Sequence, residues 1–205
     1  MITQVYNLFM PLNAHDLQTF MTAHGIAGEI LHLSVPTPTV ETAARALDVQ
    51  PEQIVKSILF LVGAGPEAGL GGLYPPPRSA ALPGASTGAN PAPALTIPVL
   101  AITCGKAYVE RRAIAAHYGV GRKRVKLASP EEVRSISGYE VGAMPPFGHR
   151  QPLPTLLDCR VLDLPVVYAG GGGENVLLRL DPGDIARFTS AEVMDLISMP
   201  DQEKE

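Results

Sequence analysis

The chain of 205 residues contains no tryptophan, and only 5% of its residues are aromatic. Its core must therefore be built mainly from aliphatic side chains. The two cysteines, Cys104 and Cys159, show no CxxC spacing and no nearby histidine or cysteine cluster. We therefore predict no metal site, no cofactor and no cysteine nucleophile. Both cysteines are expected to be thiols that serve as small buried hydrophobic residues.

Long hydrophobic runs are also absent. The longest, such as residues 58–62, fall far short of the ~20 residues that cross a bilayer. The N-terminal residues show no basic segment followed by an apolar stretch, so no secretory signal is expected. We predict a cytoplasmic protein with no membrane partner, and its 205 residues suffice to bury a core without disulfides.

The chain has no excess of positive charge, because its formal net charge is −4. This argues against indiscriminate nucleic-acid binding, and we expect no DNA partner. However, seven of the sixteen Lys and Arg residues lie between positions 106 and 126, with only Glu110 opposing them. Such a segment either contacts phosphates or forms a solvated face. These residues, the basic strip, are Lys106, Arg111, Arg112, Arg122, Lys123, Arg124 and Lys126.

The segment GYEVGAMPPFGH, residues 138–149, is rich in glycine and proline, and we call it the glycine-proline loop. Its glycines permit backbone geometries that a Cβ forbids, while Pro145 and Pro146 fix φ and withhold N–H groups. A loop of this shape can present backbone amides to a ligand. A plain surface turn has the same composition, so the loop alone leaves both interpretations open.

Capping signals predict the helices. Asn13 and Gly25 bound the first one, and Ser129, followed by Pro130 and Glu132, begins another. We predict helices over residues 13–23, 39–47, 106–117 and 129–137, and after Asp181 and Ser190. Apolar runs predict strands over residues 55–62, 98–103, 155–157, 166–169 and 176–180.

The irregular alternation of these elements predicts an α+β fold with a mixed, largely antiparallel sheet flanked by helices. Residues 63–97 contain seven glycines and seven prolines, which cannot form a second core. We predict a single domain over residues 1–205 with a flexible insertion at 63–97. The run from Gly170 to Gly173 lacks the GxxxxGK[ST] spacing and precedes a strand, so it is not a phosphate-binding loop.

Three segments in one order carry a family resemblance: TVETAARALDVQPEQIVKSILFLV (residues 39–62), the glycine-proline loop, and PTLLDCRVLDLPVVYAGGGGENVLLRLDPGDIARFTSAEVMDL (residues 154–196). Together they resemble the YbaK-type aminoacyl-tRNA editing family, which includes the editing domain inserted in bacterial prolyl-tRNA synthetases. The resemblance implies a free-standing deacylase that hydrolyses the ester of mischarged tRNA. Small amino acids such as Ala, Ser or Cys are the expected range, and a synthetase is a possible partner.

The resemblance also implies the roles of particular residues. Lys56 holds a phosphate of the terminal adenosine or polarises the ester, and amides of residues 142–144 face the carbonyl oxygen. Asp158 orients the ribose, accepts from a substrate ammonium, or forms a structural pair with Lys56. The predicted catalytic residues are Lys56, Gly142 and Asp158; the predicted substrate-binding residues are Ala143, Met144, Pro145, Pro146 and His149; the predicted tRNA-binding residues are Arg111, Arg112, Arg122, Lys123 and Arg124.

Two other functions stay open from the sequence. One is a non-catalytic descendant of the editing fold that binds tRNA or a synthetase. The other is a small-molecule-binding α/β protein, which would be favoured if the basic strip lay far from the cleft.

Overall fold

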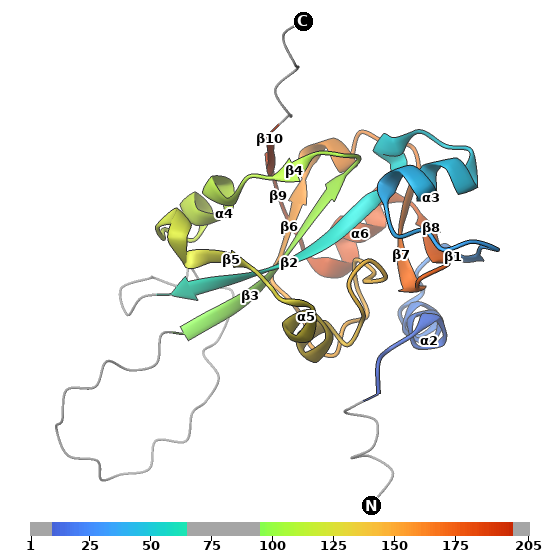
Figure 1. The fold of residues 1–205 in the computed structure, drawn as a ribbon, viewed down its shortest axis with the longest axis horizontal. Helices are drawn as coiled ribbons and strands as arrows, with labels where there is room; N and C mark the ends of the chain where they lie inside the picture. The colour runs from blue at the N-terminus through green and yellow to red at the C-terminus, as the bar shows by residue number, and fades with distance from the viewer. Residues whose placement is uncertain (1–9, 65–94, 199–205) are drawn as a thin grey trace, which may run out of the picture.

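Two long strands, β2 (Val55–Ala64) and β3 (Leu95–Cys104), form an antiparallel hairpin that crosses the centre of the molecule (Figure 1). The computed structural model describes residues 10–64 and 95–198. The strands predicted over 55–62 and 98–103 are therefore present, and both are longer than predicted. Each is a nearly continuous apolar run, which suits a strand that is covered on both faces.

Pro98 lies within β3, where a proline normally removes a hydrogen bond of the ladder. Two residues further on, Leu100 donates its N–H to the carbonyl of Pro154, toward the strand β6 (Thr155–Asp158). Backbone groups alternate in direction along a strand, so the nitrogen of Pro98 points to the same edge. Because β6 pairs only with residues 100–102, the missing N–H costs the sheet no hydrogen bond.

The other strands are β1 (Gly28–His32), β4 (Tyr108–Val109), β5 (Val125–Leu127), β7 (Val167–Gly173), β8 (Val176–Leu180), β9 (Glu192–Met194) and β10 (Ile197–Ser198). The largest sheet has the order β5-β2-β3-β6-β9, antiparallel in its first two pairings and parallel in its last two. An antiparallel sheet has the order β1-β8-β7, and β4 pairs with β10. The predicted α+β fold with a mixed, largely antiparallel arrangement is confirmed.

The helices are α2 (Ala14–His24), α3 (Val40–Leu47), α4 (Arg111–His117), α5 (Pro130–Ser137) and α6 (Pro182–Thr189), with 3-10 turns η1 (Pro51–Gln53), η2 (Arg122–Arg124) and η3 (Cys159–Val161). The capping predictions are confirmed. Asn13 and Ser129 accept hydrogen bonds from the first turns of α2 and α5, and Gly25 and Gly138 end those helices in the left-handed conformation.

These elements enclose the core on both faces of β2. Val55 and Leu59 pack in one apolar cluster with residues of α2, α5 and α6. Phe60 and Val62 pack in a second cluster with residues of α4. In Figure 1, α4 and β5 lie near one end of the hairpin and α3 near the other. Within the described ranges, no helix is long and apolar enough to cross a membrane.

Two helix predictions were wrong in part. The helix predicted from Lys106 begins only at Arg111, because Tyr108 and Val109 pair with β10 and the Glu110 side chain accepts from Arg112 N. In the described residues after Ser190, up to residue 198, no helix is present. Residues 192–194 instead form β9, whose parallel pairing with β6 overrides the local helical signal.

The insertion predicted at 63–97 was too long at both ends. Gly63 pairs with Thr96 and Ala64 with Leu95, so these positions belong to the hairpin. The rest of the predicted insertion, residues 65–94, lies outside the described residues, and the single-domain organisation stays a prediction. One further expectation was wrong: Cys104 is buried as predicted, but Cys159 is exposed.

Candidate active site

A cleft of about 800 Å³ opens beside the first half of β2. It lies there because β5 pairs only with residues 60–62, which leaves one edge of residues 55–58 without a neighbouring strand. Its walls come from the start of α3, from β2, from the start of α5, from the glycine-proline loop and from β7 and β8. A cleft of this size holds a small ligand or the end of a larger one.

Lys56 is half-buried in the wall of this cleft. Its Nζ donates a hydrogen bond of 2.7 Å to the carbonyl oxygen of Ala107. Burial lowers the pKa of Lys56, while the nearby charge of Glu41 acts in the opposite direction. In the described part of the chain, no carboxylate lies within ion-pair distance of this ammonium. The ammonium has three N–H donors, so two are available to a ligand.

The glycine-proline loop has the backbone that its composition predicts. Its glycines at 138, 142 and 148 have φ values of 91°, 86° and 77°, which other residues rarely adopt. The hydroxyl of Tyr139 donates to the carbonyl oxygen of Gly148 at 3.2 Å, which ties the two halves of the loop together. Gly142 and Met144 line the cleft.

The backbone of β7 supports this loop from behind. A Cβ on Gly170 would lie 2.6 Å from the carbonyl oxygen of Met144, so only glycine permits this approach. The N–H of Gly172 donates to the carbonyl oxygen of Ala143 at 2.9 Å. The glycine run is thus a support for the loop, which the sequence analysis missed. Successive glycines within a strand are a signal for such an approach.

Two amides of the loop, in residues that line the cleft, have no acceptor among the described residues. The amide of Ala143 donates to the carbonyl oxygen of Glu140 at 3.2 Å. Within residues 10–64 and 95–198, the amides of Gly142 and Met144 donate to no protein acceptor. Backbone donors and a half-buried ammonium in the lining of one cleft can stabilise negative charge on an oxygen of a ligand.

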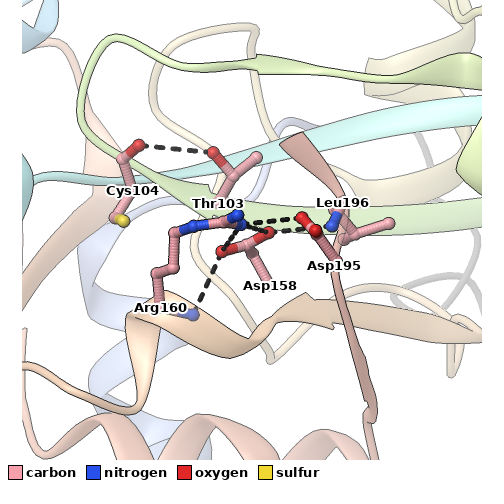
Figure 2. A network of polar contacts seen from close by, with 6 residues as sticks. All are labelled: Thr103, Cys104, Asp158, Arg160, Asp195 and Leu196. Atoms are coloured by element: carbon pink, nitrogen blue, oxygen red, sulfur yellow. Dashed lines mark hydrogen bonds and ion pairs between the residues drawn. The ribbon is translucent and has the colours of Figure 1, made fainter. Parts of the chain in front are cut away.

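Asp158 does not belong to this cleft, which corrects its predicted place in the site. Its side chain is fully buried at the end of β6, and Figure 2 shows it surrounded by donors. It accepts from Leu196 N at 2.8 Å and from the Arg160 guanidinium at 3.1 and 3.2 Å, and Arg160 also bonds Asp195 at 2.8 Å. The alternative of a structural pair with Lys56 was also wrong, because the partner of Asp158 is Arg160.

His149 fastens the loop and does not line the cleft. Its Nε2 lies 2.9 Å from the carbonyl oxygen of Pro145, and its ring contacts Tyr139 edge-on. Burial lowers the pKa of His149 to about 4, against a smaller opposing effect of the Pro145 hydrogen bond. The imidazole is therefore neutral at pH 7 and donates from Nε2. The buried Ala143, Pro145 and Pro146 also lie outside the lining.

The basic strip is exposed along α4, η2 and β5. Lys106 lines the cleft, and Lys126 precedes Leu127, which also lines it. The strip therefore begins at the cleft, and its last residue precedes a residue of the lining. The five residues predicted to bind tRNA do not line it, and within the described residues they form no ion pair.

Several lining residues were missed by the sequence analysis. Glu41 pairs with Lys106 at the cleft, and Tyr108 is 73% exposed there. The hydroxyl of Ser57 is buried without a hydrogen-bond partner in the described part of the chain. No spacing in the sequence marks these residues, because they come from separate elements. The described ranges hold no group of three His, Cys, Asp or Glu side chains that is suited to a metal ion.

Comparison with known proteins shows which family the chain resembles. Residues 94–188 match the family model of the aminoacyl-tRNA editing domain, a range that includes the glycine-proline loop but not Lys56. The fold is similar to the crystal structure of a protein proposed to be a trans-editing enzyme for prolyl-tRNA synthetase. That similarity has 29% identity and a TM-score of 0.69, and it covers 91% of this chain and 97% of the other. The predicted resemblance to the YbaK-type editing family is confirmed.

Two further proteins are similar, one in fold and one in sequence. The crystal structure of hypothetical protein APE2540 has 24% identity and a TM-score of 0.68, covering 89% of this chain and 99% of that one. The uncharacterized protein YwhH of Bacillus subtilis (strain 168) is 20% identical over 182 residues, which are 89% of this chain and 94% of YwhH. Both similarities extend over nearly the whole length of each protein.

We predict that His149→Gln reduces the loss of stability in acid. The folded pKa of about 4 lies below the ordinary 6.5, so the unfolded chain binds a proton first as the pH falls. This costs the wild type about 2 kcal/mol of unfolding free energy between pH 7.5 and pH 5. Glutamine keeps an amide donor without titrating. Urea unfolding at both pH values measures the difference, with the exposed His32→Gln as control. Equal pH dependence in the wild type and His149→Gln contradicts the prediction.

We also predict that Asp158→Ala destabilises the fold by about 2 to 3 kcal/mol, because it leaves the buried amide of Leu196 unpaired and releases Arg160. Urea unfolding at pH 7 provides the measurement. The exposed Asp163→Ala, in the same connection, is the matched control and should change stability little. An Asp158 variant as stable as the control would show that the network in Figure 2 does not hold the C-terminal strands.

Proposed function

We propose that this protein is an aminoacyl-tRNA deacylase that hydrolyses the ester of mischarged tRNA in trans, in the cytoplasm. The observation that carries the proposal is the half-buried Lys56, without an acidic partner among the described residues, in one cleft with the free amides of Gly142 and Met144. The family match over residues 94–188 supports the same chemistry. Deacylation assays with a panel of mischarged tRNAs test it.

The reaction needs little from the protein, because an aminoacyl ester is already activated. Water adds to the ester carbonyl, and the loop amides and Lys56 stabilise the negative charge on its oxygen. The bond to the ribose oxygen then breaks, and that oxygen takes a proton as the free amino acid leaves. The resemblance to the family suggests that a neighbouring ribose hydroxyl positions the water. Neither a metal ion nor a covalent nucleophile is part of this proposal.

The basic strip supports an RNA substrate. Its side chains are exposed between residues 106 and 126, and its first residue, Lys106, lines the cleft. The place of Lys106 in the cleft lining argues against the small-molecule-binding alternative, which required a strip remote from the cleft. The relative proposed to assist prolyl-tRNA synthetase suggests a synthetase as a further partner.

The side chain of the amino acid is proposed to be small, such as that of Ala, Ser or Cys. One missing methylene changes binding by only ~1 to 3 kcal/mol, so the assay panel must include all three.

The second candidate function is binding of tRNA or a synthetase without hydrolysis. One observation favours it: Asp158 and His149, two of the predicted polar site residues, serve the fold and not the cleft. The same panel separates the two functions, because a pure binding protein retains tRNA affinity and leaves every ester intact.

We predict that Lys56→Ala lowers the single-turnover rate of deacylation at least ~100-fold, because an electrostatic donor in the cleft is lost. Its thermal unfolding should stay close to that of the wild type, since the ammonium bonds only one carbonyl in the described part of the chain. Lys56→Arg should restore little, because a planar guanidinium does not reproduce a compact ammonium. A near-normal rate for Lys56→Ala would remove this residue from the mechanism.

We predict that Gly142→Ala lowers the deacylation rate by roughly tenfold or more while the affinity for uncharged tRNA stays unchanged. A Cβ at position 142 meets open space, so the effect arises from the φ of 86°, which alanine adopts with strain and which aims the loop amides. Rate and affinity are measured by single-turnover hydrolysis and filter binding.

The matched control for this substitution is Gly25→Ala. Gly25 also has a positive φ and open space around a Cβ, but it ends α2 outside the cleft. It should reduce stability without a specific effect on the rate. Arg122→Glu with Arg124→Glu should show the complementary pattern, with weaker RNA binding and a reduced salt dependence. Parallel losses of rate and RNA affinity in Gly142→Ala would argue against an oxyanion role.

A further inference from the structure

Glu41 is the only acidic side chain among the residues that line the cleft in the described structure. It lies in the first turn of α3, after the N-cap residue Thr39. Its Oε1 lies 3.1 Å from Nζ of Lys106, which follows β3. Both side chains are about half exposed, so either can change its partner without a change in the core.

The surroundings of Glu41 keep it ionised. Hydrogen bonding to its own backbone amide lowers its pKa most, followed by hydrogen bonds with Lys106 and Thr39. The first turn of a helix also favours a negative charge. The charge of Glu41 raises the pKa of Lys56, in opposition to burial, so the two charges act on each other within one cleft.

The proposed substrate carries a charge that needs a partner of this kind. In an aminoacyl ester, the α-amine is attached one carbon away from the carbonyl that water attacks. When protonated, it needs a carboxylate in a partly desolvated cleft. The sequence analysis named Asp158 as a candidate for this contact. In the structure its carboxylate is buried in the core, where it accepts hydrogen bonds from Arg160 and Leu196. Glu41 already pairs with one ammonium in the cleft, that of Lys106, at 3.1 Å.

We propose that Glu41 binds the α-ammonium of the aminoacyl group, releasing Lys106, and thereby restricts the site to esters with a free α-amine. The inference rests on the proposed function and names its substrate class. Esters whose amine is acylated, as in peptidyl-tRNA, lack this charge and are poor substrates. Lys106, once released, adds a free cation at the start of the basic strip.

If Glu41 served only the fold, its replacement would change the stability of the protein and not its choice of substrate. We expect the opposite. Exposed ion pairs contribute little to stability, so Glu41→Gln should unfold at nearly the wild-type urea concentration. The matched control is Glu29→Gln. Glu29 lies on β1 outside the cleft, and its exposed carboxylate pairs with Arg179 of β8.

The first experiment compares hydrolysis of alanyl-tRNA and N-acetylalanyl-tRNA by the wild type, Glu41→Gln and Glu29→Gln. We expect the wild type and Glu29→Gln to favour the free amine by roughly tenfold or more in kcat/KM, the size of a charge-assisted contact. Glu41→Gln should lose most of this preference, mainly through slower hydrolysis of alanyl-tRNA. Equal hydrolysis of both substrates by the wild type, or a preference that survives in Glu41→Gln, overturns the inference.

The second experiment separates this inference from the proposed function. Calorimetry measures binding of 3′-alanylamino-3′-deoxyadenosine, whose amide replaces the ester, and of its N-acetyl form. Tighter binding of the free amine that disappears in Glu41→Gln supports the assignment of Glu41, even if no ester is hydrolysed and the proposed function fails. Equal binding of both compounds by the wild type overturns the assignment even if deacylation is observed.

Discussion

The close approach of β7 to the glycine-proline loop is the contact on which the candidate site depends. The loop backbone rests directly on Gly170, and Gly172 bonds the carbonyl of Ala143. On its other side, Tyr139 and His149 close the loop on itself. The residues that carry these contacts are buried or half-buried, so the two free amides are fixed by the fold before any ligand arrives. Preorganised donors of this kind cost no rearrangement during a reaction.

Some charged side chains of the structure stabilise the core, and others line the cleft. Asp158 pairs with Arg160 and accepts a hydrogen bond from Leu196, so its carboxylate stabilises the fold and does not contact a ligand in the cleft. Lys56 and Glu41 stand in the cleft, where solvent or a ligand reaches them. A cleft that holds one acid and two lysines suits a substrate with both an anionic backbone and a cationic amine, which is the charge pattern of an aminoacylated RNA end.

Many of the helices and strands, and part of the candidate site, were predictable from the sequence. Caps at Asn13 and Ser129 and the apolar run after Val55 are local signals, and they predicted α2, α5 and β2 well. The segment after Ser190 was misjudged because its pairing with β6 is a long-range contact. The same limit applies to the site. Lys56 and the loop have recognisable motifs, whereas the partner of Asp158 and the place of Glu41 depend on how distant elements pack.

Pro98 has a consequence for the behaviour of the protein in solution. An exposed strand edge invites a strand of a second molecule, and repeated pairing of this kind leads to aggregation. β3 extends beyond β6 at residues 95–99, and within residues 10–64 and 95–198 no strand pairs with this edge. A proline at this position offers no N–H to an incoming strand. The residue that costs the native sheet nothing therefore protects it against edge-to-edge association between copies.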